Sequence, residues 1–139
     1  MIAALDSSVI VAALRTSEAY HRECFGLLDQ PGLHMRPHAI SESFSTLTGG
    51  RLGERLTADE VARAIERTIL PRVSTVNLTS AEHLAAIREA QSRGVRGGAI
   101  YDYLHLVAAR KIGAERLYTL DVDDFQSFHR PGDPVIVHP

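Results

Sequence analysis

Short apolar runs alternate with longer amphipathic stretches along this chain of 139 residues. Short apolar runs rich in β-branched residues are typical of strands buried on both faces of a parallel sheet. We expect strands at residues 2–5, 33–35, 73–78, 116–120 and 135–137. Because no two runs are joined by the short glycine-containing connection of a hairpin, we expect the strands to lie parallel with helices between them.

The stretches between these runs have the periodicity of helices. Ile40, Phe44 and Leu47 recur at helical spacing, and residues 57–60 and 79–82 match the capping box that begins a helix. We expect helices at residues 9–14, 18–29, 38–48, 57–71, 79–94 and 99–112. This alternation predicts a three-layer α/β/α fold with a central parallel sheet. Since no repeat or interdomain linker interrupts it, residues 1–139 are expected to form one domain.

Charge and cysteine content exclude several classes of protein. The net charge is −2 and the pI is about 6.4, so no overall basic field indicates nucleic-acid binding. A local basic surface remains possible, because nearly all positive charge is arginine and Lys111 is the single lysine. Cys24 is the single cysteine, which excludes an internal disulfide and fits a reducing cytoplasm. The apolar N-terminus lacks a basic segment and contains Asp6, so we expect neither a signal peptide nor a membrane span.

Acidic residues gather at one predicted edge of the sheet. Asp6 and Asp121 follow predicted strands, and Glu42 and Asp102 lie near the starts of predicted helices. In an open parallel sheet, sites form at the carboxyl ends of the strands, where the strand order reverses. Carboxylates that meet there repel one another and are stable mainly around a cation. Oxygen ligands favour Mg²⁺ or Mn²⁺, which activate water in phosphodiester cleavage.

The motifs around these acids resemble those of PIN-domain ribonucleases, and among them the VapC-like toxins of bacterial type II toxin–antitoxin systems. LDSSV at residues 5–9 is similar to the strand-end Asp-x-(Ser/Asn)-Val motif of this family. ISESFSTL at residues 40–47 is similar to its glutamate-bearing helix, and GGAIYDYLHLVAA at residues 97–109 to its aspartate-bearing helix. LYTLDVDDF at residues 117–125 resembles the last strand-end motif. The resemblance covers nearly the whole chain.

This resemblance implies a PIN-like fold and a metal-dependent endoribonuclease that cleaves structured RNA such as tRNA or rRNA. It implies that four residues hold Mg²⁺ or Mn²⁺, namely Asp6, Glu42, Asp102 and Asp121. Asp124 is the alternative to Asp121, because many relatives carry asparagine at the position of Asp121 and keep the acid at that of Asp124; Asp121 is the preferred assignment. Ser8 and Thr119 would support the site as polar partners. The resemblance also implies a homodimer and a cognate antitoxin protein as partners.

Each acid also has a purely structural interpretation. Asp6 can cap the helix that follows it, and Glu42 and Asp102 can be solvated acids in the first turn of a helix. Asp123 and Asp124 can be turn residues. These interpretations stay open for each residue taken alone. The presence of all four motifs in the order found in the family favours a metal site instead.

Other polar and aromatic residues near the motifs are open to similar alternatives. His34 and His38 are expected to be surface histidines, and His105 either orients a carboxylate or is a partly buried histidine. Tyr101 and Tyr103 are expected to pack in the core. Four arginines either contact RNA phosphates at the rim of the acidic edge or are ordinary surface residues: Arg15, Arg51, Arg55 and Arg96.

Other functional classes fit the sequence less well. A receiver domain needs a second acid beside Asp6 and an aspartate after the strand at residues 73–78, and neither is present. A haloacid-dehalogenase phosphatase needs an acid where Ser8 stands. A housekeeping RNA-processing nuclease and an inactive RNA-binding scaffold remain as alternatives within the same fold.

Overall fold

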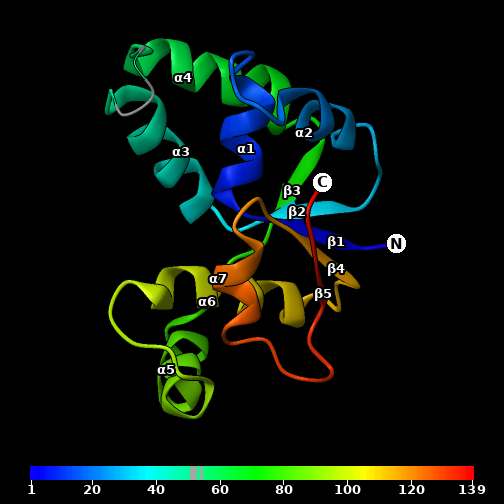
Figure 1. Cartoon of the computed structure of the whole chain (residues 1–139), viewed down its shortest axis with the longest axis vertical. Helices are drawn as coiled ribbons and strands as arrows, with labels where there is room; N and C mark the ends of the chain where they lie inside the picture. Colours follow the sequence, from blue (N-terminus) through cyan, green and yellow to red (C-terminus); the bar gives the residue numbers. More distant parts are fainter. Residues whose placement is uncertain (51–52, 54) are drawn as a thin grey trace.

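The computed structural model describes residues 1–50, 53 and 55–139, which include a five-stranded parallel sheet (Figure 1). The strand order is β3-β2-β1-β4-β5, and each neighbouring pair is parallel. The strands are β1 (Ala3–Leu5), β2 (Leu33–Met35), β3 (Val73–Thr75), β4 (Arg116–Tyr118) and β5 (Val135–Val137). The expected parallel sheet is therefore confirmed.

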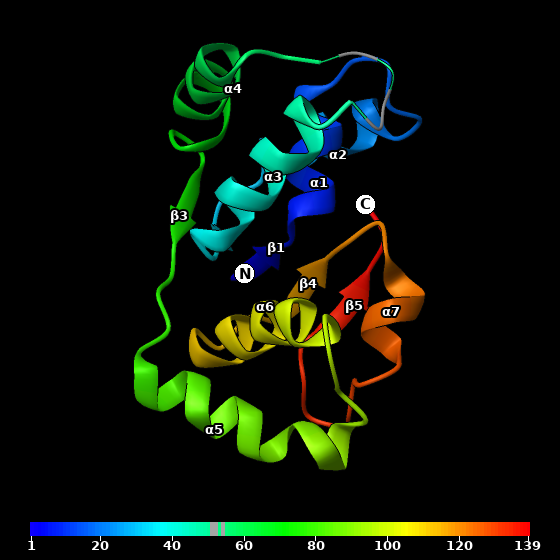
Figure 2. The ribbon, with the colours of Figure 1, turned by 90° about the vertical axis from the view of Figure 1, so that its left-hand side faces the viewer.

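Helices cover both faces of this sheet (Figure 2). One layer contains α1 (Ser7–Leu14), α2 (His21–Leu27), α3 (His38–Thr48), α4 (Ala58–Ala64) and the π-helix η1 (Ile65–Ile69). The other contains α5 (Ser80–Ala90), the 3-10 turn η2 (Gln91–Arg93), α6 (Ala99–Lys111) and α7 (Val122–Gln126). The three-layer α/β/α architecture is confirmed. No helix of the described residues is long and apolar enough to cross a membrane.

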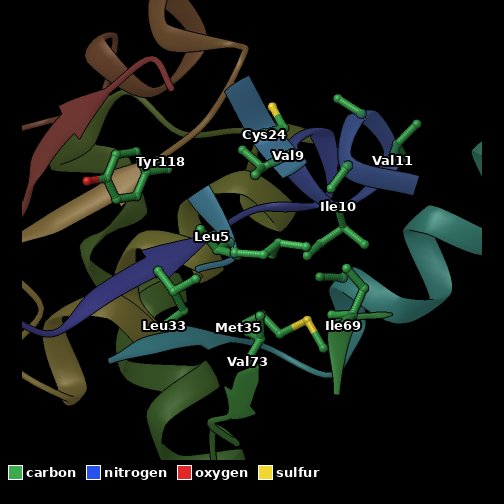
Figure 3. Packing of buried hydrophobic residues seen from close by; sticks show 14 of the residues in the cluster. Leu5, Val9, Ile10, Val11, Cys24, Leu33, Met35, Ile69, Val73 and Tyr118 are labelled. Carbon is green, nitrogen blue, oxygen red and sulfur yellow. The ribbon is translucent and has the colours of Figure 1, made fainter. Parts of the chain in front are cut away.

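The alternating side chains of the central strands divide the core into two parts. Leu5 belongs to the cluster under α1 to α4, together with Leu33 and Met35 of β2 (Figure 3). Ala3 is a member of the same cluster. Ala4 belongs to the second cluster, under α5 to α7. Because both faces of β1 are buried, its sequence is a continuous apolar run, as expected for a central parallel strand.

Several expected elements have different bounds in the structure. The strands expected at residues 73–78 and 116–120 end at Thr75 and Tyr118, and the helix expected at residues 18–29 is confined to α2. The two capping boxes are confirmed at Thr57 and Thr79, but their helices end as η1 and η2 rather than as regular α-helix. α7 was not expected at all.

The strand order reverses between β1 and β4. The chain runs outward from β1 through β2 to β3 and then crosses over to β4 on the other side of β1. Asp6 directly follows β1 and Thr119 directly follows β4, and the Asp6 N–H donates to the carbonyl oxygen of Tyr118 at 3.2 Å. The first and last motifs therefore meet at the switch point, where α/β proteins form their sites.

Candidate active site

Two hydroxyl groups fix the carboxylate of Asp6. The Ser8 hydroxyl donates to Asp6 Oδ1 at 2.6 Å, and the Thr119 hydroxyl donates to Asp6 Oδ2 at 2.6 Å. Each hydroxyl also accepts a backbone N–H from beyond β4, Ser8 Oγ from Leu120 and Thr119 Oγ1 from Asp121, both at 2.9 Å. The carboxyl ends of β1 and β4 are thus tied together around one carboxylate.

Asp6 is both a helix cap and a buried acid. Its side chain accepts from the N–H groups of Ser8 and Val9 at the start of α1, so the capping interpretation is confirmed. The residue is only 2% exposed, and burial raises its pKa, opposed by the hydrogen bonds from Ser8 and Thr119 and by the charge of His105. Capping and membership of the acidic site are compatible, because the second oxygen faces Thr119 rather than the helix.

Glu42 of α3 is held by His105 of α6. His105 Nε2 lies 2.7 Å from Glu42 Oε1, and the imidazole is almost completely buried. Burial acts to raise the pKa of Glu42, but the hydrogen bond from His105 and the charges of His105, His38 and Arg36 hold it below its usual value. Among the described residues, the buried Nδ1 of His105 has no hydrogen-bond partner. Within the described part of the chain, Glu42 is therefore the one polar partner of this ring, which agrees with the interpretation that His105 orients a carboxylate.

Asp102 lies in the first turn of α6, half-buried, with other carboxylates nearby. Desolvation raises its pKa to about 6, and the charges of Asp6, Glu42 and Asp121 act in the same direction. His105 opposes them. The interpretation of Asp102 as a freely solvated acid is therefore wrong, since this carboxylate is both desolvated and repelled by the three others.

Asp121 and Asp124 lie at and just after the start of α7. Asp121 is at the surface, and desolvation together with the charge of Asp124 raises its pKa. Asp124 lines two hollows of about 300 Å³ and 320 Å³, one shared with Asp102 and the other with Asp121 and Asp123. Since Asp123 and Asp124 belong to the first helical turn, their interpretation as turn residues is wrong.

The acids converge without forming a closed cage. Within the described part of the chain, no three His, Cys, Asp or Glu side chains are placed to hold one metal ion as they stand. No Lys, Arg or His of the described residues forms an ion pair with Asp6, Asp102 or Asp121. An oxygen-only donor set with mutually repelling charges fits a hard divalent cation, whose binding would remove the repulsion.

One positive residue that was not among the expected arginines lies near this edge. Arg36, which directly follows β2, is 8% exposed, and its charge acts on Glu42. The sequence offered a signal for it, because it follows a predicted strand as Asp6 does. Arg15 is half-buried and lies 3.9 Å from Glu18, whereas Arg55 and Arg96 are exposed. Arg51 lies outside the described residues.

The histidines and tyrosines divide between surface and core. His34 and His38 are partly exposed, in agreement with the surface interpretation. Tyr103 is completely buried, as expected, but Tyr101 is 53% exposed, so its expected core packing is wrong. The ring of Tyr101 stacks on His38.

Fold and site together define an α/β protein with a carboxylate-rich site at the switch point of a parallel sheet. The chain belongs to the PIN domain family, whose model matches residues 3–131. The resemblance stated from the four motifs is therefore confirmed. A comparison with curated protein sequences gives no match.

Solved structures of toxins share this fold. VapC20 of Mycobacterium tuberculosis, a sarcin-ricin loop cleaving toxin, has a TM-score of 0.72 and 19% identity over 95% of this chain and 99% of that chain. VapBC2 of Rickettsia felis, bound to a DNA fragment from its promoter, has a TM-score of 0.66 and 16% identity over 99% of this chain and 98% of that chain. A toxin–antitoxin complex from Klebsiella pneumoniae has a TM-score of 0.64 and 18% identity over 99% of this chain and 97% of that chain.

Proposed function

We propose that this protein is a metal-dependent endoribonuclease and acts as the toxin of a toxin–antitoxin pair. The observation that carries the proposal is the convergence of Asp6, Glu42 and Asp102 with Asp121 at the switch point, where only Glu42 has an ion-pair partner among the described residues. Membership of the PIN domain family supports the same conclusion.

In this proposal the four carboxylates hold Mg²⁺ or Mn²⁺, with Asp124 as the alternative to Asp121. The cation would supply an activated water and stabilise the charge on the leaving oxygen of a phosphodiester. Ser8 and Thr119 fix the direction of the Asp6 carboxylate, and His105 fixes that of Glu42. Exposed arginines, Arg55 and Arg96 among them, would contact RNA phosphates away from the cleaved bond.

The toxin role draws on the names of the structural neighbours. The complexes from R. felis and K. pneumoniae carry toxin–antitoxin names, and the M. tuberculosis protein cleaves the sarcin-ricin loop. By this analogy we propose a structured RNA as the substrate, an antitoxin protein as the partner, a homodimer as the assembly and the cytoplasm as the place of action.

Cleavage of RNA by the purified protein tests the nuclease. We expect cutting of tRNA or rRNA with Mg²⁺ or Mn²⁺, none with EDTA, and a loss of at least about 100-fold in Asp6→Asn and Asp102→Asn. Asp29→Asn is the matched control, because this exposed acid precedes β2 at the opposite edge of the sheet. Equal cleavage by all three variants would contradict the proposal.

Expression in cells separates a toxin from a housekeeping nuclease. A toxin should arrest growth, and a small DNA-binding protein encoded next to it should relieve the arrest. A housekeeping enzyme would cleave RNA in vitro without arrest. An inactive scaffold would bind RNA with no metal-dependent cut in any variant.

A further inference from the structure

Tyr101 exposes a large aromatic side chain beside the acidic site. It is 53% exposed, although its neighbours on α6 from Tyr103 to Ala109 are all buried. It precedes Asp102 in the first turn of the helix. Single exposed aromatic residues are common on protein surfaces, so exposure alone implies no function.

The position of Tyr101 is fixed by two neighbours. The ring of His38 lies nearly parallel to the tyrosine ring, with centroids 5.5 Å apart and an angle of 18°. Arg36, almost buried at the end of β2, donates from Nη1 to the carbonyl oxygen of Tyr101 at 3.3 Å. Arg36 holds the backbone and His38 stacks on the ring, while more than half of the tyrosine stays exposed to solvent, so the ring is both supported and accessible.

The Tyr101–His38 pair is continuous with the residues of the proposed active site. His38 also lies next to His105, with ring centroids 6.5 Å apart, and His105 bonds to Glu42. Tyr101 itself adjoins Asp102. The exposed Tyr101–His38 pair therefore lies close to Glu42 through the buried ring of His105, and close to Asp102 along α6.

We propose that the Tyr101–His38 pair is a stacking site for one unpaired nucleobase next to the phosphodiester at the acidic site, an inference that rests on the proposed function. An aromatic ring whose orientation is already fixed loses little freedom when a base stacks on it. Bases inside a duplex are covered by their neighbours, whereas bases in loops can be turned out and stacked on aromatic side chains. The site would therefore select RNA loops over helices.

Fluorescence of a base analogue measures this stacking without cleavage. The probe is an RNA hairpin with 2-aminopurine in its loop, mixed with the full chain in EDTA. We expect strong quenching with the wild type and with Tyr101→Phe, but not with Tyr101→Leu, which should bind the hairpin about 10-fold more weakly. His38→Ala, which leaves the tyrosine ring unsupported, should give intermediate quenching. Tyr20→Leu is the matched control, because Tyr20 is also exposed and pairs with His138.

Cleavage kinetics with Mn²⁺ give the second measurement. Loss of a stacking contact that is made equally in the ground state and the transition state raises KM and leaves kcat unchanged, so Tyr101→Leu should raise KM about 10-fold. Thermal unfolding of the variants controls for folding, and Tyr101→Phe keeps the test valid if the leucine variant is unstable. Absence of quenching by the wild type, or equal quenching by Tyr101→Leu, overturns the inference. Quenching that depends on Tyr101 in a protein that cuts no RNA supports the stacking site and contradicts the nuclease.

Discussion

Thr119 shows how a single buried hydroxyl joins two elements. It is completely buried, donates to Asp6 Oδ2 and accepts the N–H of Asp121, so it links the acid after β1 to the acid after β4. The family-like motif identified Thr119 from the sequence, but its partner Asp6 is 113 positions away. Only folding brings these two residues together, and local sequence patterns carry no information on such a pair.

The isosteric variant Thr119→Val tests this link. Valine keeps the shape but leaves the Asp6 oxygen and the Asp121 N–H without their partner, so the free energy of unfolding should fall by about 1–3 kcal/mol. Urea denaturation measures the change. Thr119→Ser keeps the hydroxyl and should lose clearly less stability. No loss of stability in Thr119→Val, or a larger loss in Thr119→Ser than in Thr119→Val, would show that the methyl group matters more than the hydroxyl.

The crowded charge of Asp102 predicts a variant that is more stable than the wild type. The pKa of Asp102 is raised to about 6 from 3.8, so the folded state favours its protonated form. The contribution of Asp102 to the free energy of unfolding is therefore fully present below about pH 4 and is lost as the pH rises through about 6. In EDTA at pH 7.5, Asp102→Asn should add about 1 kcal/mol to the free energy of unfolding, after allowing for screening of a half-exposed carboxylate.

Urea denaturation at two pH values checks this prediction. The gain of Asp102→Asn over the wild type should disappear at pH 4, where both side chains are neutral. Asp29→Asn, in an exposed position, should show no such gain at either pH. A variant less stable than the wild type at pH 7.5 would mean that Asp102 is not repelled by its neighbours.

At the scale of elements, the sequence predicted most helices and strands. Its predictions were wrong where tertiary contacts decide whether a short helix forms or which side chain is buried. The bounds of α3 and β5 were predicted because apolar periodicity and glycine mark them. α7 was missed because it has only one helical turn of acidic residues, which local propensity assigns to a turn. Tyr101 was misplaced because α6 is apolar on almost every side, so its periodicity does not show which tyrosine faces water.

The contact between α3 and α6 through Glu42 and His105 predicts a shift in pH dependence. His105 lowers the pKa of Glu42 and also opposes the raised pKa values of Asp6 and Asp102. Without it all three carboxylates should protonate at higher pH. In His105→Leu we therefore expect the acidic limb of the rate profile to move to higher pH, with a loss in kcat/KM of about 10–100-fold at neutral pH.

Two comparisons show whether His105 acts through Glu42. His105→Gln can still donate to the carboxylate and should recover part of the activity, although the charge is gone. His83→Gln is the matched control, because His83 lies on α5 and contacts the backbone of Thr79. If kcat/KM of His105→Leu falls by the same factor at every pH, so that the acidic limb does not shift, His105 has a purely structural role.

At the scale of the whole molecule, the acidic site lies where the two helical layers meet. Glu42 comes from α3 in one layer and Asp102 from α6 in the other, while Asp6 and Asp121 follow the central strands β1 and β4 (Figure 2). The four segments and the sheet edge were predictable from the sequence, since strand ends mark the edge. The choice between Asp121 and Asp124 was not, because both lie on the same short helical turn.

Divalent cations should therefore stabilise the whole fold, and this stabilisation identifies the fourth acid. Binding at 100 times the Kd adds about 2.7 kcal/mol to the free energy of unfolding, so Mn²⁺ should raise the Tm of the wild type. The increase should vanish in Asp6→Asn and Asp102→Asn. It should also vanish in whichever of Asp121→Asn and Asp124→Asn removes a ligand, while Asp123→Asn, on the same turn, serves as the control.

We expect Asp121 to be that ligand, because its charge acts on both Asp6 and Asp102, whereas the charge of Asp124 acts on Asp121. A full Mn²⁺ response in Asp121→Asn and none in Asp124→Asn would reverse the assignment, and no response in the wild type would contradict the metal site itself.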